Sequence, residues 1–507
     1  MFNPSSAATL AATTLLVGLM LFNTSLVVVF ITVFLLIWLS TRRPPGLPPG
    51  PPLLPIVGNI LSMDADPRVT FSKLRRQYGD IFSVYVFNRP LIVLSGYNVI
   101  KDALVKNGDV FSDRPYSFMT DFYAGRKGIA HTSGSHWKQQ RKFALTTLRE
   151  FGMGKSFLEA NIQEELSDFM KVIDDWGGDA FECKRLVHNA MANTLCSMCF
   201  GKRFEYTDPR FLKFLKMMDE ICETLGTGKV LNSFPEVRYL PGDVFSFKKL
   251  MNMKHTIDDE EIIKNIEEHI DNFDVDNVDD FITAYFREMR RRGQGDETFD
   301  MGHLKMSMFD LFIGGTETTG TTIRWTLLYF LHYPEVQEKC FREIQEHIGL
   351  SRRPSMKDKT SLNYVTATIT EVQRCSDIVP TGIPHSVSKD VLFHGYTFPK
   401  GVTVITDLES VLQDPAVWGD PKTFRPDRFL DDEGKFKKRE ECIPFSLGRR
   451  KCLGESLAQM ELFLFITSII QRFHILPDKG TLPPLKGIIG ITNAAPNFNI
   501  RAVPRDC

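Results

Sequence analysis

The sequence predicts a mainly α-helical body with small β-sheets, preceded by one N-terminal membrane helix. Residues 1–41 contain no Asp, Glu, Lys or Arg. Helical periodicity of apolar residues dominates from about residue 95 to about residue 375, and strand patterns are short and scattered. With 507 residues, 24% of them charged, and a formal net charge of −1, the chain has an ordinary globular composition. We therefore expect no nucleic-acid partner.

The N-terminal segment 1–41 is predicted to anchor the chain in a membrane. Residues 17–39 are almost wholly apolar and would form a helix of about 34 Å, long enough to cross a bilayer. Arg42 and Arg43 follow at once, so the positive-inside rule keeps the downstream chain in the cytoplasm and Met1 on the other side. A cleaved secretory signal is the alternative, but the uncharged start and the long apolar run argue against it.

A proline-rich hinge over residues 42–59 separates the anchor from the rest. Its prolines cannot continue the membrane helix and make a stiff spacer. A ligand for proline-reading domains is the alternative interpretation. Size alone suggests two or three domains. However, no linker-like change of composition interrupts residues 60–507, which are therefore predicted to form one domain.

Strands are predicted in three places. Residues 80–86 and 91–94 flank a turn and indicate a β-hairpin, and shorter strand patterns occur near residues 402–406 and 488–491.

The cysteines indicate a reducing compartment, because their number is odd and their positions are scattered. Cys196 and Cys199 have the spacing of a redox or zinc pair. They lie in an apolar helical run over residues 188–200 without a second pair nearby, so we interpret them as core residues.

Cys452 has a different setting, a short loop between Gly448 and Gly454. A helix with an apolar face is predicted from Glu455 onward, so the sulfur lies just ahead of a helix start. Unpaired N–H groups and the helix dipole favour a thiolate there, which suits a soft metal. A buried structural cysteine beside a basic turn is the alternative.

This loop resembles the haem-binding signature of the cytochrome P450 family at every signature position, namely Phe445, Gly448, Arg450, Cys452 and Gly454. The resemblance covers the whole chain and implies the P450 fold, with Cys452 as the axial ligand of the iron in haem b. It also implies that Phe445 contacts the haem and that Arg450 pairs with a haem propionate.

Three further residues are candidates for propionate contacts. Trp137 and Arg141 share one helix face at a spacing of four residues and resemble a Trp-x-x-x-Arg motif of the family. The resemblance implies that this pair and His385 join Arg450 in holding the propionates. A surface cation–π contact and a structural histidine are the alternatives.

The helix predicted over residues 301–333 is interrupted by glycines at its centre. Each glycine costs up to about 1 kcal/mol in a helix interior, and threonine hydroxyls there can bond the carbonyl four residues back and bend the helix. The segment resembles the oxygen-binding motif of the family. This implies that Gly315 lies against the haem, that Thr318 donates a hydrogen bond to bound dioxygen and that Glu317 relays protons. Tight helix packing through small residues is the alternative.

Glu371 and Arg374 have the spacing of an ordinary surface ion pair on a helix. They also resemble the Glu-x-x-Arg motif of the family, which implies a buried structural triad with Arg428 that fixes the haem-loop scaffold.

The resemblance also places a substrate pocket with a nearly all-apolar wall, so we expect a lipophilic small-molecule substrate. Any aromatic member of this wall could instead be core. The predicted pocket residues are Phe118, Phe122, Phe309, Phe312, Val379, Ile383 and Ile489. The apolar segment 234–242 could dip into the membrane beside the anchor, with a capped surface loop as the alternative.

No dinucleotide-binding motif occurs, so electrons must come from another protein. The resemblance implies NADPH–cytochrome P450 reductase as the donor, cytochrome b5 as an optional second donor, and single-pass insertion in the endoplasmic reticulum membrane with a lumenal N-terminus. Basic residues around Trp137 and Cys452 could form the donor surface. They are Lys138, Lys142, Lys435, Lys437, Lys438, Arg439, Arg449 and Lys451.

The predicted reaction is monooxygenation of a fatty acid, steroid or xenobiotic, by hydroxylation or epoxidation. Two alternatives stay open, a haem-thiolate isomerase or peroxygenase that needs no reductase, and a non-catalytic haem sensor or electron carrier.

Overall fold

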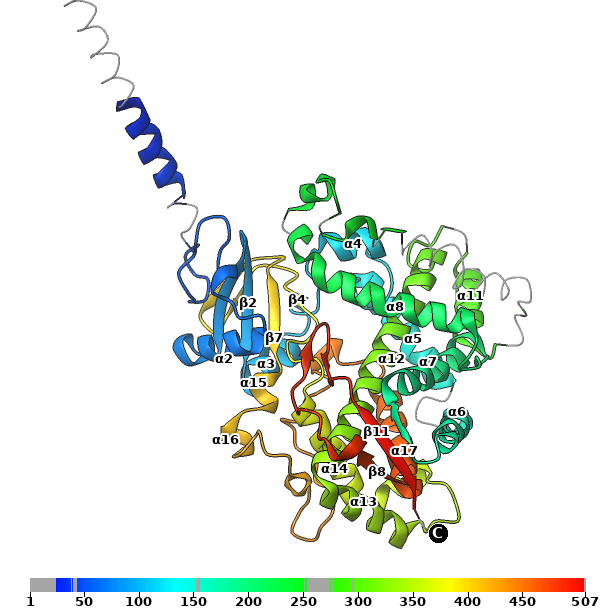
Figure 1. The fold of residues 1–507 in the computed structure, drawn as a ribbon. Coiled ribbons are helices and arrows are strands. Elements are labelled where there is room, and N and C mark those ends of the chain that lie inside the picture. The colour runs from blue at the N-terminus through cyan, green and yellow to red at the C-terminus, as the bar shows by residue number, and fades with distance from the viewer. Residues whose placement is uncertain are drawn as a thin grey trace, which may run out of the picture.

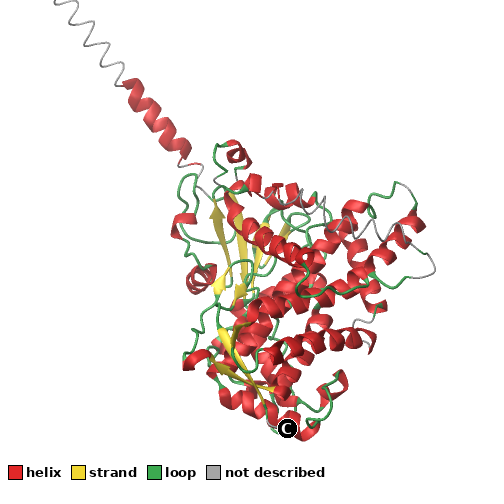
Figure 2. Ribbon diagram, turned by 45° about the vertical axis from the view of Figure 1, so that its right-hand side comes forward, coloured by secondary structure: helices red, strands yellow, loops and turns green. Residues whose placement is uncertain are grey.

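The structure, a computed structural model, describes residues 24–505 except 38, 40–42, 152–155, 233, 244, 250, 253–273, 275–277 and 294. Helices make up most of the described chain, and the strands gather into small sheets at its edge (Figure 2). The largest sheet lies with α2 (Pro67–Tyr78) and α3 (Tyr97–Lys101) on the side nearest the N-terminal helix, and the long helices fill the rest (Figure 1). The mainly α-helical prediction is confirmed.

The four-stranded sheet confirms the predicted hairpin and the strand expected near residue 404. Strand β1 (Ile81–Val86) pairs antiparallel with β2 (Arg89–Ser95), and β7 (Thr403–Asp407) runs parallel to β2. Strand β4 (His385–Ser386) completes the sheet beside β7, with His385 opposite Val404. His385 is therefore held by backbone pairing to a rigid sheet.

The other strands form one three-stranded sheet, in the order β3-β11-β8, and two short antiparallel pairs. They are β3 (Ala180–Glu182), β11 (Asn499–Pro504), β8 (Phe473–Pro477), β5 (Val391–Phe393) with β6 (Tyr396–Phe398), and β9 (Ile488–Ile489) with β10 (Asn493–Ala494). Strand β9 confirms the strand predicted near residue 488.

Helices form the main body. The remaining α-helices that the structure describes in full or in part are α4 (Phe118–Ala124), α5 (Gly134–Glu150), α6 (Ser156–Asp175), α7 (Cys183–Phe200), α8 (Pro209–Thr227), α11 (Phe281–Arg292), α12 (Met301–His332), α13 (Pro334–His347), α14 (Asn363–Ser376), α15 (Glu409–Leu412), α16 (Pro415–Trp418) and α17 (Glu455–Arg472). The helix predicted over residues 301–333 is thus present as α12. Its N-cap Asp300 accepts a hydrogen bond from the backbone N–H of His303.

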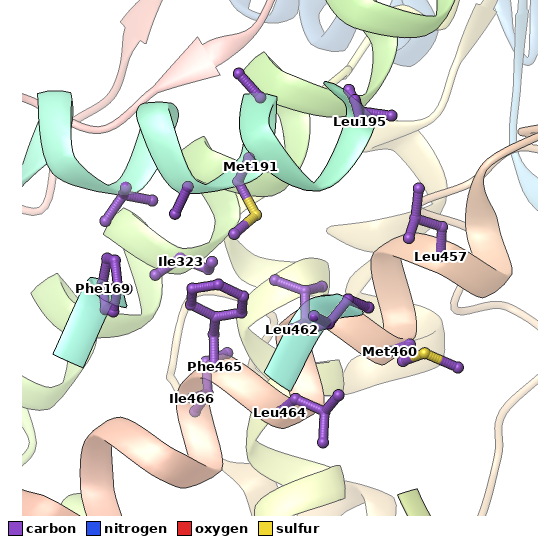
Figure 3. Packing of buried hydrophobic residues seen from close by; sticks show 14 of the residues in the cluster. Phe169, Met191, Leu195, Ile323, Leu457, Met460, Leu462, Leu464, Phe465 and Ile466 are labelled. Atoms are coloured by element: carbon purple, nitrogen blue, oxygen red, sulfur yellow. The ribbon is translucent and has the colours of Figure 1, made fainter. Parts of the chain in front are cut away.

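The largest hydrophobic core lies where α7, α12 and α17 meet. Met191 of α7 points toward side chains of α17, with Ile323 of α12 close by (Figure 3). Cys196 and Cys199 belong to the same core and are 1% and 0% exposed, which confirms their interpretation as core residues. This core fixes the position of α12, which carries the glycine-rich segment.

Only part of the predicted membrane anchor lies within the described residues. Positions 24–37 are helical, with exposed apolar side chains. In the described portion of the chain, no helix has the length and apolar character needed to cross a membrane. The first seven positions of the predicted span 17–39 lie outside the described residues.

Glu371 and Arg374 do not form a surface pair, because both side chains are fully buried. Arg374 Nε donates to Glu371 Oε2 at 2.7 Å, and Arg428 Nε donates to Glu371 Oε1 at 2.9 Å. Both arginines also donate to backbone carbonyls, among them those of Leu412 and Trp418. The triad therefore joins α14 to the chain that leads into the cysteine loop, and its buried charges depend on one another.

A second buried carboxyl lies in α17. Glu461 is 1% exposed, and its Oε2 atom has no hydrogen-bond partner among the described residues. Burial raises the pKa of this carboxyl to about 8, against the opposing effect of hydrogen bonds from Thr319 and Thr194. The folded protein therefore holds a proton at Glu461 that the unfolded chain releases near its ordinary pKa.

Replacing this carboxyl by an amide tests that proton. Between about pH 5 and pH 8, the wild type should lose stability relative to Glu461→Gln by about 1.4 kcal/mol per pH unit, because only its unfolded state is ionised there. Above about pH 8 the difference should level off, since both states are then ionised. Urea midpoints followed by far-UV circular dichroism at pH 5 to 9 measure this, and a pH-independent difference contradicts it.

Candidate active site

The loop that carries Cys452 is held by close backbone contacts. The N–H of Cys452 donates to the carbonyl of Phe445 at 3.0 Å. Gly448 opens a short 3-10 turn, η7 (Gly448–Arg450), with a φ of +72°, and a Cβ atom there would lie 2.0 Å from the Leu104 carbonyl oxygen. Only glycine fits this position, so the loop is pressed against the segment that contains Leu104.

Cys452 is a free thiol whose residue surface is exposed. Dense protein around the loop nevertheless raises the pKa of the thiol, and the opposing effects of the Gly454 N–H and of nearby Arg141 and Lys451 are smaller. The N–H of Gly454 at the helix start lowers the pKa of the thiol as expected from the sequence, but burial outweighs it, so the expected net preference for a thiolate is not met. A coordinated metal ion would reverse the balance, because it deprotonates its thiol ligand.

Arg450 ties the cysteine loop to the chain before α5. Its guanidinium donates to the carbonyls of Ser112 at 2.8 Å, Ile129 at 3.3 Å and Thr132. The same group lies 3.8 Å from the ring centroid of Trp137, which α5 positions. The structure thus brings together Arg450 and Trp137, which are more than 300 residues apart in the sequence.

Two more arginines lie in this region. Arg141, one helical turn after Trp137, donates through Nη2 to the carbonyl of Lys451 beside Cys452. Arg114, which sequence analysis missed, donates to the carbonyls of Ala130 at 3.0 Å and Pro384 at 2.7 Å. An arginine in the segment before Pro115 was the available signal, but nothing local to it shows that it meets residues about 270 positions away.

These groups form a partly buried basic cluster, defined as Arg114, Arg141, Arg450 and the neighbouring His385. Burial and the other arginines lower the pKa of Arg450 to about 8 and that of Arg114 to about 10. Burial and the same positive charges lower the pKa of His385 to about 3, and its Nδ1 lies 2.8 Å from the Phe111 carbonyl oxygen. The positive charges repel one another, so an anionic group bound among them would be stabilised.

A half-buried aspartate, Asp310, connects this cluster to α12. Oδ2 of Asp310 accepts hydrogen bonds from the backbone N–H groups of Ile129 at 2.6 Å and Ala130 at 2.8 Å. Burial raises the pKa of Asp310 to about 6, while these bonds and the positive charges of Arg114 and Arg450 lower it. Asp113 also acts on Arg450, and these two carboxylates are still fewer than the three arginines.

On α12, threonine hydroxyls donate hydrogen bonds to the backbone carbonyl four residues earlier, as predicted. Thr318 Oγ1 donates to the Gly314 carbonyl at 2.6 Å, and Thr322 Oγ1 donates to the Thr318 carbonyl at 2.8 Å. The two glycines have different surroundings. A Cβ atom on Gly315 would lie 2.8 Å from Leu195 Cδ1 of α7, whereas one on Gly314 would have no atom within 4 Å. Gly315 therefore allows α7 to pack closely against α12, whereas Gly314 faces open space.

Hydroxyl groups hold one carboxylate oxygen of Glu317, and the side chain is partly exposed. Its Oε1 accepts from the hydroxyls of Thr321 at 3.2 Å and Thr492 at 3.1 Å. Its Oε2 lies 3.6 Å from Nδ1 of His188, and the side chain is 28% exposed. The carboxylate is thus positioned next to Thr318 while it still reaches solvent.

The predicted pocket residues fall into two groups. Phe118, Phe309 and Phe312 are buried in the largest core cluster, and the ring of Phe312 packs against Phe200 and Phe214. The others are less buried. Phe122 and Ile383 are exposed, whereas Val379 and Ile489 are half-buried.

The site as a whole fits haem. An accessible thiol lies in a tightly held loop, a surplus of buried positive charge lies beside it, and the buried Nε1 atom of Trp137 has no hydrogen-bond partner in the described parts of the chain. A group with a thiolate-ligated metal and acidic substituents satisfies all three. These features define the haem-thiolate class of proteins.

Comparison with known proteins agrees with this class. The model of the family described as cytochrome P450 matches residues 48–501. The chain is 40% identical to cytochrome P450 2J3 of Rattus norvegicus, over 93% of this chain and 94% of the relative. It is 39% identical to cytochrome P450 2J2 of Homo sapiens, over 92% and 93%, and 40% identical to cytochrome P450 2C54 of Mus musculus, over 94% and 99%.

The chain therefore belongs to the cytochrome P450 family. It is a monooxygenase that uses haem and O2.

The free Nε1 of Trp137 gives a specific test of the fit to haem. Trp137→Phe keeps a ring beneath Arg450 but removes the N–H group. Because Nε1 has no protein partner, the urea midpoint of the haem-free protein should change little, whereas haem transfer to apomyoglobin should speed up about tenfold or more. Trp325→Phe is the matched control, because Trp325 Nε1 donates to the Asn493 carbonyl at 2.9 Å. The control should lose stability instead. Unchanged haem transfer in Trp137→Phe contradicts this account.

Proposed function

We propose that this protein inserts one atom of O2 into a lipophilic substrate, with electrons that NADPH–cytochrome P450 reductase delivers from NADPH. The observation that carries this proposal is the hydroxyl–carboxylate pair of Thr318 and Glu317 beside the open position at Gly314. An alcohol next to a solvent-reaching carboxylate is suited to deliver protons into a site that is otherwise closed to water. Monooxygenation consumes two protons in each turnover.

In this proposal the basic cluster and Trp137 bind the acidic substituents of the haem, and Cys452 ligates its iron. When bound, the haem supplies the binding and reductive activation of dioxygen. The protein orients this group through Arg450 and Arg141, which are themselves fixed by backbone carbonyls. Phe445 contributes the carbonyl that holds the Cys452 N–H. The buried triad then keeps the loop from shifting.

Proton delivery in this proposal runs along α12. Glu317, whose side chain is 28% exposed, takes a proton from solvent, and its Oε1 stays bonded to Thr321 and Thr492. The hydroxyl of Thr318 turns from the Gly314 carbonyl toward the reacting oxygen and donates a hydrogen bond to it. Its backward bond to that carbonyl holds the hydroxyl ready at this turn of the helix.

The substrate class follows from the apolar wall. The buried Phe118, Phe309 and Phe312 present apolar surface, so we propose a fatty acid, steroid or xenobiotic held mainly by apolar contacts. We also propose that the protein works at the endoplasmic reticulum membrane. Exposed apolar side chains in residues 24–37 support this, as do Tyr239 and Leu240, which are 75% and 51% exposed.

We propose that the reductase, or cytochrome b5 as a second donor, docks on the basic residues near Cys452. Several of these are already paired within the chain. Arg449 lies 2.7 Å from Asp109, and Lys451 lies 2.5 Å from Glu455. The contribution of these two to steering an acidic partner is therefore reduced. Lys138 and Lys142 on α5 are better placed to act.

Substitution of Thr318 separates this function from the two alternatives. With reductase, NADPH and a panel of fatty acids, steroids and drugs, Thr318→Ala should form at least about tenfold less product while NADPH is still consumed, because proton delivery is impaired. Thr322→Ala loses the same kind of backward bond one turn later and is the control. It should keep its product yield.

The alternatives give other outcomes. An isomerase or peroxygenase would turn over with peroxide alone and be indifferent to Thr318→Ala. A sensor or electron carrier would show no substrate-dependent NADPH consumption. Either outcome contradicts the proposed function.

A further inference from the structure

Three potential metal ligands from three helices meet beside the glycine-rich segment. They are His188 of α7, Asp219 of α8 and Glu317 of α12, and one nitrogen or oxygen atom of each lies within 4.8 Å of the others. Within the described ranges, no second group of three His, Cys, Asp or Glu side chains meets this spacing. None of the three is among the residues assigned to holding haem.

His188 has an unused ring nitrogen. The residue is 7% exposed, and its Nε2 atom is buried without a hydrogen-bond partner among the described residues. Nδ1 is the nitrogen that faces Glu317, so an ion bound there leaves the ring proton on Nε2. The ring packs directly against Gly320 of α12, because a Cβ atom on that glycine would lie only 2.7 Å from the His188 Cδ2 atom. This close packing restricts rotation of the ring.

The imidazole also has the charge state that a metal ligand needs. Burial and the nearby positive charges of Arg324 and Lys184 lower the pKa of His188 to about 4, while Asp219 acts in the opposite direction. The ring is therefore neutral at pH 7 and offers a lone pair without first losing a proton.

The carboxylates are suited to the same ion. Thr321 and Thr492 hold Oε1 of Glu317, which leaves Oε2 directed at His188, with Nδ1 3.6 Å away. With metal–ligand bonds of about 2.0–2.2 Å, this separation leaves room for an ion between the two atoms at a near-tetrahedral angle. Hydroxyls that orient a ligating carboxylate are typical of metal sites. Asp219 is exposed and gives the ion a route from solvent.

We propose that His188, Asp219 and Glu317 form an inhibitory site for a divalent transition-metal ion with the ligand preference of Zn²⁺. One imidazole and two carboxylates are a donor set that Zn²⁺ accepts, with water in the fourth position. The bound ion holds Glu317 Oε2 and bridges α12 to α7 and α8. It thereby withdraws the carboxylate from proton delivery, and this consequence rests on the role of Glu317 in the proposed function.

Zinc binding tests the site independently of turnover. The full-length, haem-loaded protein is dialysed against micromolar Zn²⁺, and the retained zinc is measured by elemental analysis. The wild type should retain one more Zn²⁺ per chain than His188→Asn, with at least about tenfold tighter binding. His394→Asn is the matched control, because His394 pairs with Asp102 at 3.2 Å but has no third ligand. The control should retain zinc like the wild type.

A second variant covers the case in which His188→Asn does not fold. Asp219→Asn changes an exposed side chain and should weaken zinc binding to a similar degree. Equal zinc affinity of the wild type and Asp219→Asn overturns the site.

Inhibition is then measured as the ratio of product formed with and without Zn²⁺. The ratio should fall for the wild type and stay near one for Asp219→Asn. Zinc that is retained without loss of product overturns the inhibitory role. If instead the protein forms no product under any condition while zinc is retained, the proposed function has failed and the metal site stands.

Discussion

The guanidinium of Arg450 is the contact on which the rest of the site depends. It leaves the cysteine loop, donates to carbonyls of Ser112, Ile129 and Thr132, and stacks on Trp137. The same stretch of chain donates backbone N–H groups to Asp310 of α12. One buried side chain therefore sets the distance between the sulfur-bearing loop and the helix that carries Thr318. A shift of the cysteine loop or of α12 would therefore be transmitted to the other through Arg450.

Several charged groups of the site are destabilised in the folded protein when no ligand compensates them. Burial and mutual repulsion lower the pKa of Arg450 and Arg114, and burial raises the pKa of Cys452 and Asp310. Each shift means that the charged form is less stable in the folded protein than in water. An iron-bearing group with acidic substituents offsets the penalties at the thiol and at the arginines together, because it brings a cation to the thiol and anions to the arginines. The repulsion among these arginines therefore favours the binding of such a group.

Local patterns explain what could be predicted from the sequence. The hairpin of β1 and β2 and the helix α12 follow from periodicity and from turn or proline residues nearby. The Cys452 loop and the Glu371 triad were found through family motifs. Arg114 was missed because its partners at Ile383 and Pro384 come from a distant segment. The roles of Gly314 and Gly315 could not be separated either, since only the packing of α7 against α12 decides which glycine faces Leu195.

The central claim is that Cys452 binds a haem iron through sulfur, and the absorption spectrum of the reduced protein under carbon monoxide tests it most directly. We predict a Soret band at the long wavelength typical of thiolate ligation for the wild type, and its loss in Cys452→Ser. A wild-type band at the shorter wavelength of nitrogen ligation, or a Cys452→Ser spectrum identical to that of the wild type, would contradict the account.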